Sequence, residues 1–415
     1  MRINRVTALI GMLCVAGCGG GGSSLNGGGG GSTSEPNVQP VTVDSGPTVV
    51  ASSNSPAVNT LYTTVRICVP GTGTCQDIDH VQVDTGSSGL RILASALTLS
   101  LPLQKDSNGN VIAECVHFVD GSSWGPLRQT DIKISGEVAS NQSVQVIGDA
   151  AYPTVPNACL GTGTAENTVT AFGANGILGV GPFIQDCGPA CEQAGGATYF
   201  TCNSSTGCTD SGIPVALQLT NPVTAFATDN NGVIIELPTI SSTSSMVNGS
   251  LIFGIGTQSN NGLGSAKVLT LDNIGALTTD YKTQTLSQSF IDSGSNAYYF
   301  PDTTINVCPD SSSAPQFFCP GTTLNLVATL VGINGVSSSV NFSVADANTL
   351  FTNATSRIAA AVSLAAPSTS VSADGSTFNG TATFDWGLPF YFSRNVYTAI
   401  ENQNTSAGMG PYFAF

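Results

Sequence analysis

The tripeptide Asp-Thr/Ser-Gly occurs twice in the same local setting, at Asp84 and at Asp292. The first copy stands in VQVDTGSSGLRIL, residues 81–93, and the second in SFIDSGSNAYYFP, residues 289–301. In both, an apolar run leads into the aspartate and a serine follows the glycine. One such turn in each half of the chain predicts two lobes that donate a carboxylate each to a shared site. Two carboxyl groups that share a proton can support hydrolysis without a metal ion.

The tripeptide alone is a weak signal, because it also begins at Asp44 and at Asp210. Those two copies lack the hydroxyl in the fourth position, where Pro47 and Ile213 stand. Asp and Gly are favoured in tight turns for ordinary backbone reasons, so we interpret both copies as turns.

The composition predicts a mostly β protein. Only 9% of the 415 residues are charged, there are 48 glycines, and short apolar or alternating runs are separated by turn residues. The expected strands include residues 61–69, 131–135, 143–147, 232–237 and 250–253. The better helical candidates are residues 355–364 and 395–402.

Charge and residue types exclude several functions. A formal net charge of −15 and the lack of a basic stripe argue against nucleic-acid binding. The only histidines are His80 and His117, too few for a typical catalytic metal centre, and no nucleophile-elbow sequence accompanies them. The glycine runs at residues 19–31 have no strand–helix context for phosphate binding. We therefore expect neither a metal nor another cofactor.

The N-terminus has the pattern of an export signal. Arg2 and Arg5 precede a short apolar stretch, and residues 15–18 (VAGC) resemble the lipobox of bacterial lipoproteins. This predicts a signal peptide at residues 1–17, lipidation of Cys18 and a flexible Gly/Ser-rich tether at residues 18–40. The expected location is the bacterial cell envelope, as an outer-membrane lipoprotein that is periplasmic or surface-exposed and contacts the membrane only through its lipid. An ordinary secretory signal with an incidental cysteine is the alternative.

Cysteine usage agrees with an oxidising compartment. Twelve cysteines are present, and ten remain after Cys14 and Cys18 are set aside. Proximity predicts the pairs Cys68–Cys75 and Cys308–Cys319 and allows Cys115–Cys159. A cluster of four, whose connectivity the sequence leaves open, consists of Cys187, Cys191, Cys202 and Cys208. Disulfides are favoured there over a zinc site, because the spacings are irregular and no histidine is near.

Further segments accompany the two acidic turns in a fixed order. They are residues 118–125 (FVDGSSWG), 174–181 (ANGILGVG), 251–256 (LIFGIG) and 384–391 (FDWGLPFY). Together with the turns, they resemble the landmarks of the pepsin-type aspartic proteases across residues 60–402. The chain also resembles a bacterial family of uncharacterised lipoproteins, the DUF3443 type.

The resemblance implies a mostly β, bilobal fold with a cleft between the lobes. The N-terminal lobe would span residues 41–235, with a disulfide-rich insertion at 183–212, and the C-terminal lobe residues 236–415. The segments at 174–181 and 384–391 would thread beneath the catalytic turns, and 118–125 would be the flap hairpin over the cleft.

The resemblance also implies roles for the residues of both turns. Asp84 and Asp292 would be the catalytic pair, one a base toward bound water and the other an acid toward the scissile carbonyl. The threonine and serine after each aspartate would brace the two turns, the fourth-position serines would hold the outer carboxylate oxygens, and the glycines would let the backbone turn without a Cβ clash. These supporting residues are Thr85, Gly86, Ser87, Ser293, Gly294 and Ser295.

The cleft departs from the family pattern at two positions. The flap residue three positions before Gly121 is Phe118, where the family has a tyrosine, and Arg91 replaces a bulky aromatic residue. Arg91 near the cleft would alter substrate choice and stabilise ionised Asp84. Asp120 belongs to the same flap segment, and Trp124 would have either an aromatic role near the cleft or a packing role.

The expected function is an extracytoplasmic aspartic endopeptidase, a monomer acting on polypeptides. One alternative is a pepsin-like lipoprotein that binds peptide or glycan without cutting it, and another is a structural surface protein.

Overall fold

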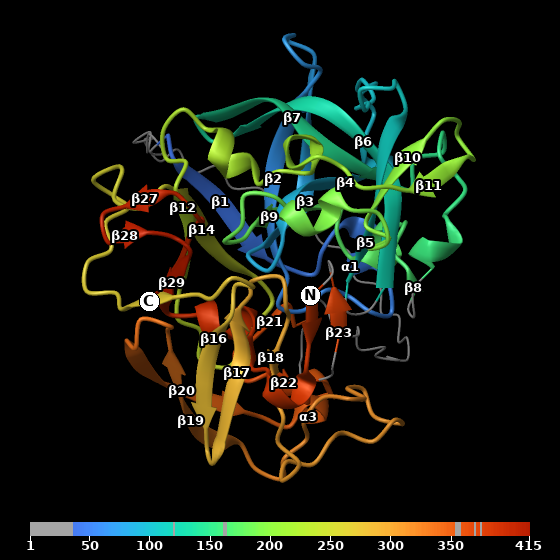
Figure 1. The fold of residues 1–415 in the computed structure, drawn as a ribbon. Coiled ribbons are helices and arrows are strands. Elements are labelled where there is room, and N and C mark those ends of the chain that lie inside the picture. The colour runs from blue at the N-terminus through green and yellow to red at the C-terminus, as the bar shows by residue number, and fades with distance from the viewer. Residues whose placement is uncertain (1–35, 119–120, 161–163, 353–357, 369–370, 374–375) are drawn as a thin grey trace, which may run out of the picture.

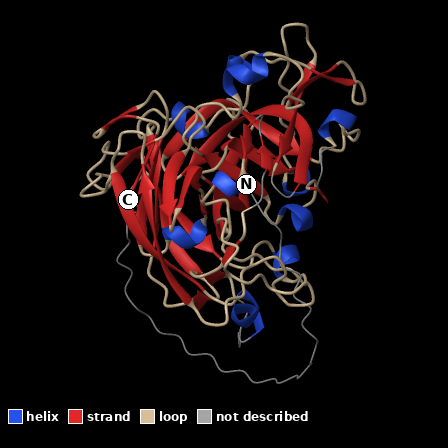
Figure 2. Ribbon diagram, turned by 60° about the horizontal axis from the view of Figure 1, so that its bottom comes forward, coloured by secondary structure: helices blue, strands red, loops and turns tan. Residues whose placement is uncertain are grey.

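The computed structural model describes residues 36–118, 121–160, 164–352, 358–368, 371–373 and 376–415 (Figure 1). The described chain is mostly β, as predicted, with short helices at its periphery (Figure 2). The α-helices of the described residues are α1 (Thr48–Ala51), α2 (Val169–Phe172) and α3 (Ala347–Thr352), and the other helices are short 3-10 helices.

A 16-stranded sheet contains most strands of the first 250 residues and several from the C-terminal end. In spatial order its strands are β11 (Cys208–Asp210), β10 (Tyr199–Cys202), β5 (Val111–His117), β6 (Gly121–Ile134), β7 (Glu137–Ile147), β4 (Ser88–Leu93), β9 (Gly176–Val180), β3 (Cys75–Asp84), β2 (Leu61–Cys68), β1 (Val38–Val43), β14 (Val247–Phe253), β12 (Gly232–Leu237), β26 (Arg394–Ala399), β29 (Tyr412–Ala414) and β15 (Val268–Thr270), with β8 (Thr164–Ala165) beside β6.

A seven-stranded sheet is built entirely from the second half of the chain and lies at the bottom of Figure 1. Its order is β20 (Ser337–Val344), β19 (Leu324–Val331), β16 (Leu277–Tyr281), β17 (Gln284–Ile291), β25 (Asp385–Trp386), β18 (Tyr298–Tyr299) and β22 (Ala365–Ala366). Three two-stranded sheets complete the described part: β13 (Thr243–Ser244) with β21 (Ala360–Ala361), β23 (Val371–Ala373) with β24 (Ser376–Phe378), and β27 (Asn404–Thr405) with β28 (Gly408–Met409).

The two sheets repeat one arrangement around the two acidic turns. In the large sheet, β9 lies between β3 and β4, parallel to β3 and antiparallel to β4. In the second sheet, β25 lies in the same way between β17 and β18. Each acidic turn therefore connects two strands that are not adjacent in the sheet. A third strand, from a distant part of the sequence, lies between them.

The large sheet joins the two ends of the chain. β1 pairs with β14 over six residues, and β12 pairs with both β14 and β26. The expected lobe boundary between residues 235 and 236 falls inside β12. The expected tether also ends earlier than residue 40, since β1 begins at Val38.

Both helical predictions differ from the structure where it is described. Asn395 to Ala399 belong to β26, because they pair with β12 and β29 on either side. In the other candidate, residues 355–357 lie outside the described residues, and Ala360–Ala361 form β21. Sheet pairing here overrides a weak local helical pattern.

The disulfide predictions are confirmed. Cys68–Cys75, Cys115–Cys159 and Cys308–Cys319 are bonded, and the open cluster resolves into Cys187–Cys191 and Cys202–Cys208. Both pairs of the cluster lie inside the 183–212 segment, which they close into two small loops.

An aromatic cluster packs against the strands that carry the second acidic turn. Phe384 stacks on Trp386 at 4.0 Å between ring centroids and on Phe300 at 4.8 Å. Phe342 contacts the same rings edge-on. These side chains are buried, so β17 and β25 rest on a densely packed base.

Candidate active site

The two acidic turns meet face to face. Asp84 ends β3 and Asp292 directly follows β17, and both side chains are buried. The threading strands come close beneath each turn. A Cβ on Gly179 of β9 would lie 2.7 Å from the Ser88 backbone, and one on Gly387 would lie 2.2 Å from the Ala297 carbonyl oxygen. Only glycine fits at these two positions.

Each carboxyl group is held by an equivalent pair of hydrogen bonds. The Ser87 hydroxyl donates to Asp84 Oδ2 at 2.5 Å, and the Ser295 hydroxyl donates to Asp292 Oδ2 at 2.8 Å. The amides two residues after each aspartate donate to the Oδ1 atoms, from Gly86 at 2.8 Å and from Gly294 at 2.7 Å. Donors on both oxygens fix the plane of each carboxyl group.

The hydroxyls of Thr85 and Ser293 cross between the turns. The Thr85 amide donates to Ser293 Oγ at 3.1 Å, and the Ser293 amide donates to Thr85 Oγ1 at 3.0 Å. The Ser293 hydroxyl then donates to the Val83 carbonyl at 3.0 Å, and that of Thr85 lies 3.3 Å from the Ile291 carbonyl. This reciprocal brace has near two-fold symmetry and ties both carboxyl groups to one rigid unit.

The glycine of each turn leaves space for the carboxyl group of the other turn. Neither has the left-handed backbone conformation that the predicted turn role would favour. A Cβ on Gly86 would instead lie 2.8 Å from Asp292 Cγ, and one on Gly294 would lie 2.4 Å from Asp84 Oδ1. Glycine is needed because each turn makes room for the carboxyl group of the other.

The two carboxyl groups share a hydrogen bond and have different proton affinities. Burial, together with the charge and hydrogen bond of Asp84, raises the pKa of Asp292 to about 7. Burial alone would raise the pKa of Asp84, but hydrogen bonds from Asp292, Ser87 and Gly86 help to bring it below its ordinary value. The pair therefore holds one proton near neutral pH, on Asp292.

A cavity of about 400 Å³ lies against the first acidic turn. Residues 85–88 form one side of it, Phe118 and residues 182–190 form others, and residues 273–275 and Glu401 come from the second half of the chain. His117 also lines it, and burial lowers the pKa of this imidazole. The cavity is thus shared by both halves of the chain and is next to the carboxyl pair.

The flap segment contributes one side chain to this cavity. Phe118 lines it and packs edge-on against Phe172 at 5.7 Å. The Phe118 amide donates to the carbonyl of Gly121 at 2.8 Å, which closes the hairpin tip; Asp120 lies outside the described residues. Trp124 is absent from the cavity lining. Its indole donates to the Tyr152 carbonyl at 3.1 Å, so it has the packing role.

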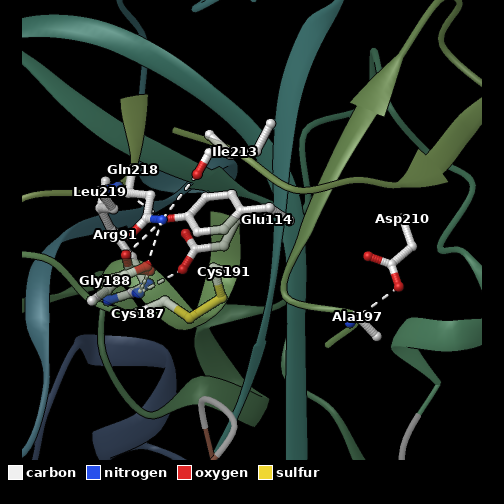
Figure 3. Close-up of a disulfide and its surroundings, with 12 residues drawn as sticks. Arg91, Glu114, Cys187, Gly188, Cys191, Ala197, Asp210, Ile213, Gln218 and Leu219 are labelled. Atoms are coloured by element: carbon white, nitrogen blue, oxygen red, sulfur yellow. Dashed lines mark hydrogen bonds and ion pairs between the residues drawn. A yellow bond between two sulfur atoms is a disulfide. The ribbon is translucent and has the colours of Figure 1, made fainter. Parts of the chain in front are cut away.

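Arg91 does not face the cleft, contrary to the expectation from its position. It is 1% exposed and pairs with Glu114 at 2.6 Å (Figure 3). It also pairs with Asp186 at 3.2 Å. The Tyr199 hydroxyl donates to the other oxygen of Asp186 at 2.7 Å. The guanidinium therefore pairs with two buried carboxyl groups and does not stabilise Asp84. Through these pairs it links β4 to β5, which leads into the flap, and to the cavity wall near the Cys187–Cys191 disulfide.

Several residues of the site were missed by sequence reasoning. The Tyr391 hydroxyl lies 2.8 Å from Thr85 Oγ1, and the Gln82 amide donates to the Gly294 carbonyl at 2.9 Å. Gln82 stands two positions before Asp84, so the period of a strand places both on one face, a signal that was available. Asp186 and its neighbours were assigned to an insertion but form a cavity wall.

Of the other two acidic tripeptides, the one at Asp44 lies in a bend, as interpreted, whereas the interpretation is wrong for Asp210, which ends strand β11 and is followed by irregular chain. Asp44 accepts the Gly46 amide at 2.8 Å and pairs with His80 at 3.4 Å. Asp210 accepts the amide of Ala197 (Figure 3) and also that of Gly195. Within the described ranges, no group of three His, Cys, Asp or Glu side chains is placed to hold a metal ion, and no helix has the length and apolarity to cross a membrane.

The family model for "Protein of unknown function (DUF3443)" matches residues 33–415. The chain belongs to the DUF3443 family. Among curated protein sequences, none matches this DUF3443 chain. Among solved structures, it is similar to the aspartic proteinase from Irpex lacteus, with a TM-score of 0.51, 15% identity, 91% of this chain covered and 96% of that one. At this identity the likeness shows the fold: the DUF3443 chain has the pepsin-like architecture that the motifs predicted.

Proposed function

We propose that this protein is an aspartic endopeptidase in which the Asp84–Asp292 pair activates water to hydrolyse peptide bonds. The observation that carries the proposal is the matched environment of the two carboxyl groups, each held on both oxygens and joined by the Thr85–Ser293 brace. Such an arrangement is costly to build, because it buries two acids side by side, and it suits general acid–base chemistry.

The difference in pKa gives each acid a role. Ionised Asp84 is the base that takes a proton from water, and protonated Asp292 is the acid that donates to the carbonyl oxygen of the substrate. The attacking water adds to the carbonyl carbon to give a gem-diol. Asp84 then passes the proton it took from water to the amide nitrogen, the C–N bond breaks and the amine leaves, and a gem-diol hydroxyl returns a proton to Asp292 as the carboxyl product forms. The cavity along residues 85–88 would hold a substrate side chain, with Phe118 over it.

The site of action is outside the cytoplasm. Five disulfides fit an oxidising compartment. The lipobox at Cys18 supports a lipid anchor in the outer membrane. The expected partners are polypeptide substrates, and the expected state is a monomer.

Cleavage of an unfolded protein substrate between pH 3 and pH 7 tests the proposal. Asp84→Asn and Asp292→Asn should each abolish cleavage, and pepstatin should inhibit it. Asp210→Asn is the matched control, since Asp210 begins an acidic tripeptide that lies at the end of β11 and is not part of the carboxyl pair, and it should retain activity. Intact substrate across this pH range with folded protein would reject the endopeptidase.

A second function has one observation in its favour. Phe118 replaces the flap tyrosine of the pepsin-type family and removes a phenol from the cavity. A non-cleaving peptide- or glycan-binding lipoprotein would keep the cavity and lose the chemistry. In the same experiment, binding of peptide or pepstatin without cleavage would identify this alternative.

A further inference from the structure

A third buried carboxyl group lies behind the pair. Asp385 is the first residue of β25 and is 2% exposed. It pairs with Phe290 of β17 and with Tyr299 of β18, the two strands that flank the Asp292 turn. Its Oδ1 atom has no hydrogen-bond partner among the described residues, and its carboxyl group is hydrogen-bonded to the Ser295 hydroxyl. An acid in this place is unexpected, because the segment threads through an aromatic core.

Hydrogen counting shows which partner donates. The Ser295 hydroxyl has one proton, and it is directed to Asp292 Oδ2 at 2.8 Å. In the contact between Ser295 and Asp385 the proton must therefore come from the carboxyl group. Burial, with the charge of Asp292, raises the pKa of Asp385 well above its ordinary value and outweighs the opposite effect of the Ser295 hydrogen bond, which agrees with a neutral acid. No ion pair between described residues involves Asp385.

The first acidic turn has no such group. The residue that corresponds to Asp385, two positions before the threading glycine, is Ile177, which is buried and apolar. The third carboxyl group is thus present behind Asp292 and absent behind Asp84. This is the clearest asymmetry in a site that is otherwise near symmetric.

We propose that Asp385 is a protonated positioning residue, which donates to Ser295 and through that hydroxyl strengthens the hydrogen bond to Asp292. The catalytic meaning rests on the proposed function, but the hydrogen-bond chain Asp385–Ser295–Asp292 does not. A donor at Ser295 makes its own proton a better donor to ionised Asp292. Asp385 thereby limits how far burial raises the pKa of Asp292 and keeps the acid able to release its proton.

The surroundings of Asp385 set the direction of the effect. The titratable groups that face it are Asp292, Asp84 and the buried phenol of Tyr391. The Tyr391 phenol is neutral, whereas the negative charges of Asp292 and Asp84 would oppose a negative charge at Asp385. If Asp385 were ionised, its removal would lower the pKa of Asp292; if it is a neutral donor, its removal raises that pKa.

Carboxyl carbon NMR of protein labelled at aspartate measures this without reference to activity. In the unchanged protein, the Asp385 resonance should remain at the protonated position from pH 4 to pH 7. Asp385→Asn retains a donor to Ser295 and should leave the titration of the Asp84–Asp292 pair near that of the wild type. Asp385→Leu removes the donor and should raise the upper apparent pKa of the pair by some tenths of a unit.

A double variant tests the route through Ser295. In a Ser295→Ala background, Asp385→Leu should cause no further shift in the upper apparent pKa. An ionised Asp385 resonance, a fall in the pKa of the pair in Asp385→Leu, or a shift that persists without Ser295 would overturn the proposal. If the unchanged protein cuts no substrate while these titrations behave as expected, the endopeptidase is rejected and the hydrogen-bond chain stands. The Asp385 resonance of the unchanged protein decides the matter even if Asp385→Leu does not fold.

Discussion

Gly294 and Asp84 are in such close approach that a single methyl group on the glycine would lie 2.4 Å from Asp84 Oδ1. The two residues are more than 200 positions apart, and their contact sets the distance between the halves of the site. The same relation holds in reverse between Gly86 and Asp292.

Gly294→Ala should therefore separate the two carboxyl groups. Asp84 cannot yield easily, because hydrogen bonds hold both of its oxygens. We expect an overpacking cost of about 1–3 kcal/mol in unfolding free energy and a loss of about 10²-fold in peptidase activity. Urea unfolding and peptide cleavage measure the two effects. Gly321→Ala, at a position with open space around it, is the control and should change neither.

The Thr85–Ser293 brace should be cooperative. Thr85→Val or Ser293→Ala leaves a buried amide without its acceptor, at a cost of about 1–3 kcal/mol in unfolding free energy. Because each hydroxyl serves the opposite turn, the double variant should cost less than the two single variants together. The exposed pair Thr329–Ser339, whose hydroxyls lie 3.0 Å apart, offers a comparison cycle. Additive effects at Thr85 and Ser293 would contradict the idea of one rigid unit.

Loss of Arg91 should destabilise the fold. Arg91→Ala leaves the buried carboxyl groups of Glu114 and Asp186 without their cation, which costs about 3–5 kcal/mol in unfolding free energy. Arg66→Ala is the matched control, since its ion pair with Asp77 is solvent-exposed and should contribute little to stability. Chemical denaturation at pH 7 compares them. A similar, small effect for both variants would show that the buried cluster is not held by its charge balance.

The raised pKa of Asp292 predicts how stability depends on pH. In the unfolded chain this group titrates near its ordinary value of 3.8, and in the folded protein at about 7. The folded state then binds more protons between these values, so its contribution to stability is full below pH 4 and is lost as the pH rises through 7.

Asp292→Asn removes this dependence. Thermal unfolding between pH 4 and pH 7 should show a midpoint that falls with pH in the wild type and falls less in the variant, which should be the more stable at pH 7. The Asp210→Asn variant should follow the wild type. Parallel curves for the wild type and Asp292→Asn would show that Asp292 is not the protonated member of the pair.

The site could be predicted from the sequence where the signal was local. The two turns, the threading glycines and three of the disulfides follow from short motifs and spacing. The role of Gly86 and Gly294 was not predictable, because the carboxyl group that each accommodates belongs to the other half of the chain. Arg91 was misplaced for the same reason, since its partners Glu114 and Asp186 come from separate segments.

Residues 395–402 show the corresponding limit for the fold. Their local pattern favours a helix weakly, whereas pairing with β12 and β29 makes most of them a strand. The position of Asp385 in the site was not predicted either. It lies in the segment 384–391, which was recognised by its apolar residues and its glycine. Only the register of β25 against β17 shows that it faces the Ser295 turn.

The pairing of β1 with β14 has a consequence for biogenesis. β1, the first strand of the described residues, can pair at its end with β2 soon after synthesis, but its partner along its whole length is β14, made about 200 residues later, as the Val43–Val247 register requires. Long-range pairing of this kind slows folding and leaves strand edges uncovered in the meantime. The same delay separates Asp84 from Asp292, so a nascent chain has only half of the carboxyl pair until most of the chain has been made. Late completion of the large sheet would then hold back any hydrolytic activity until synthesis is nearly complete.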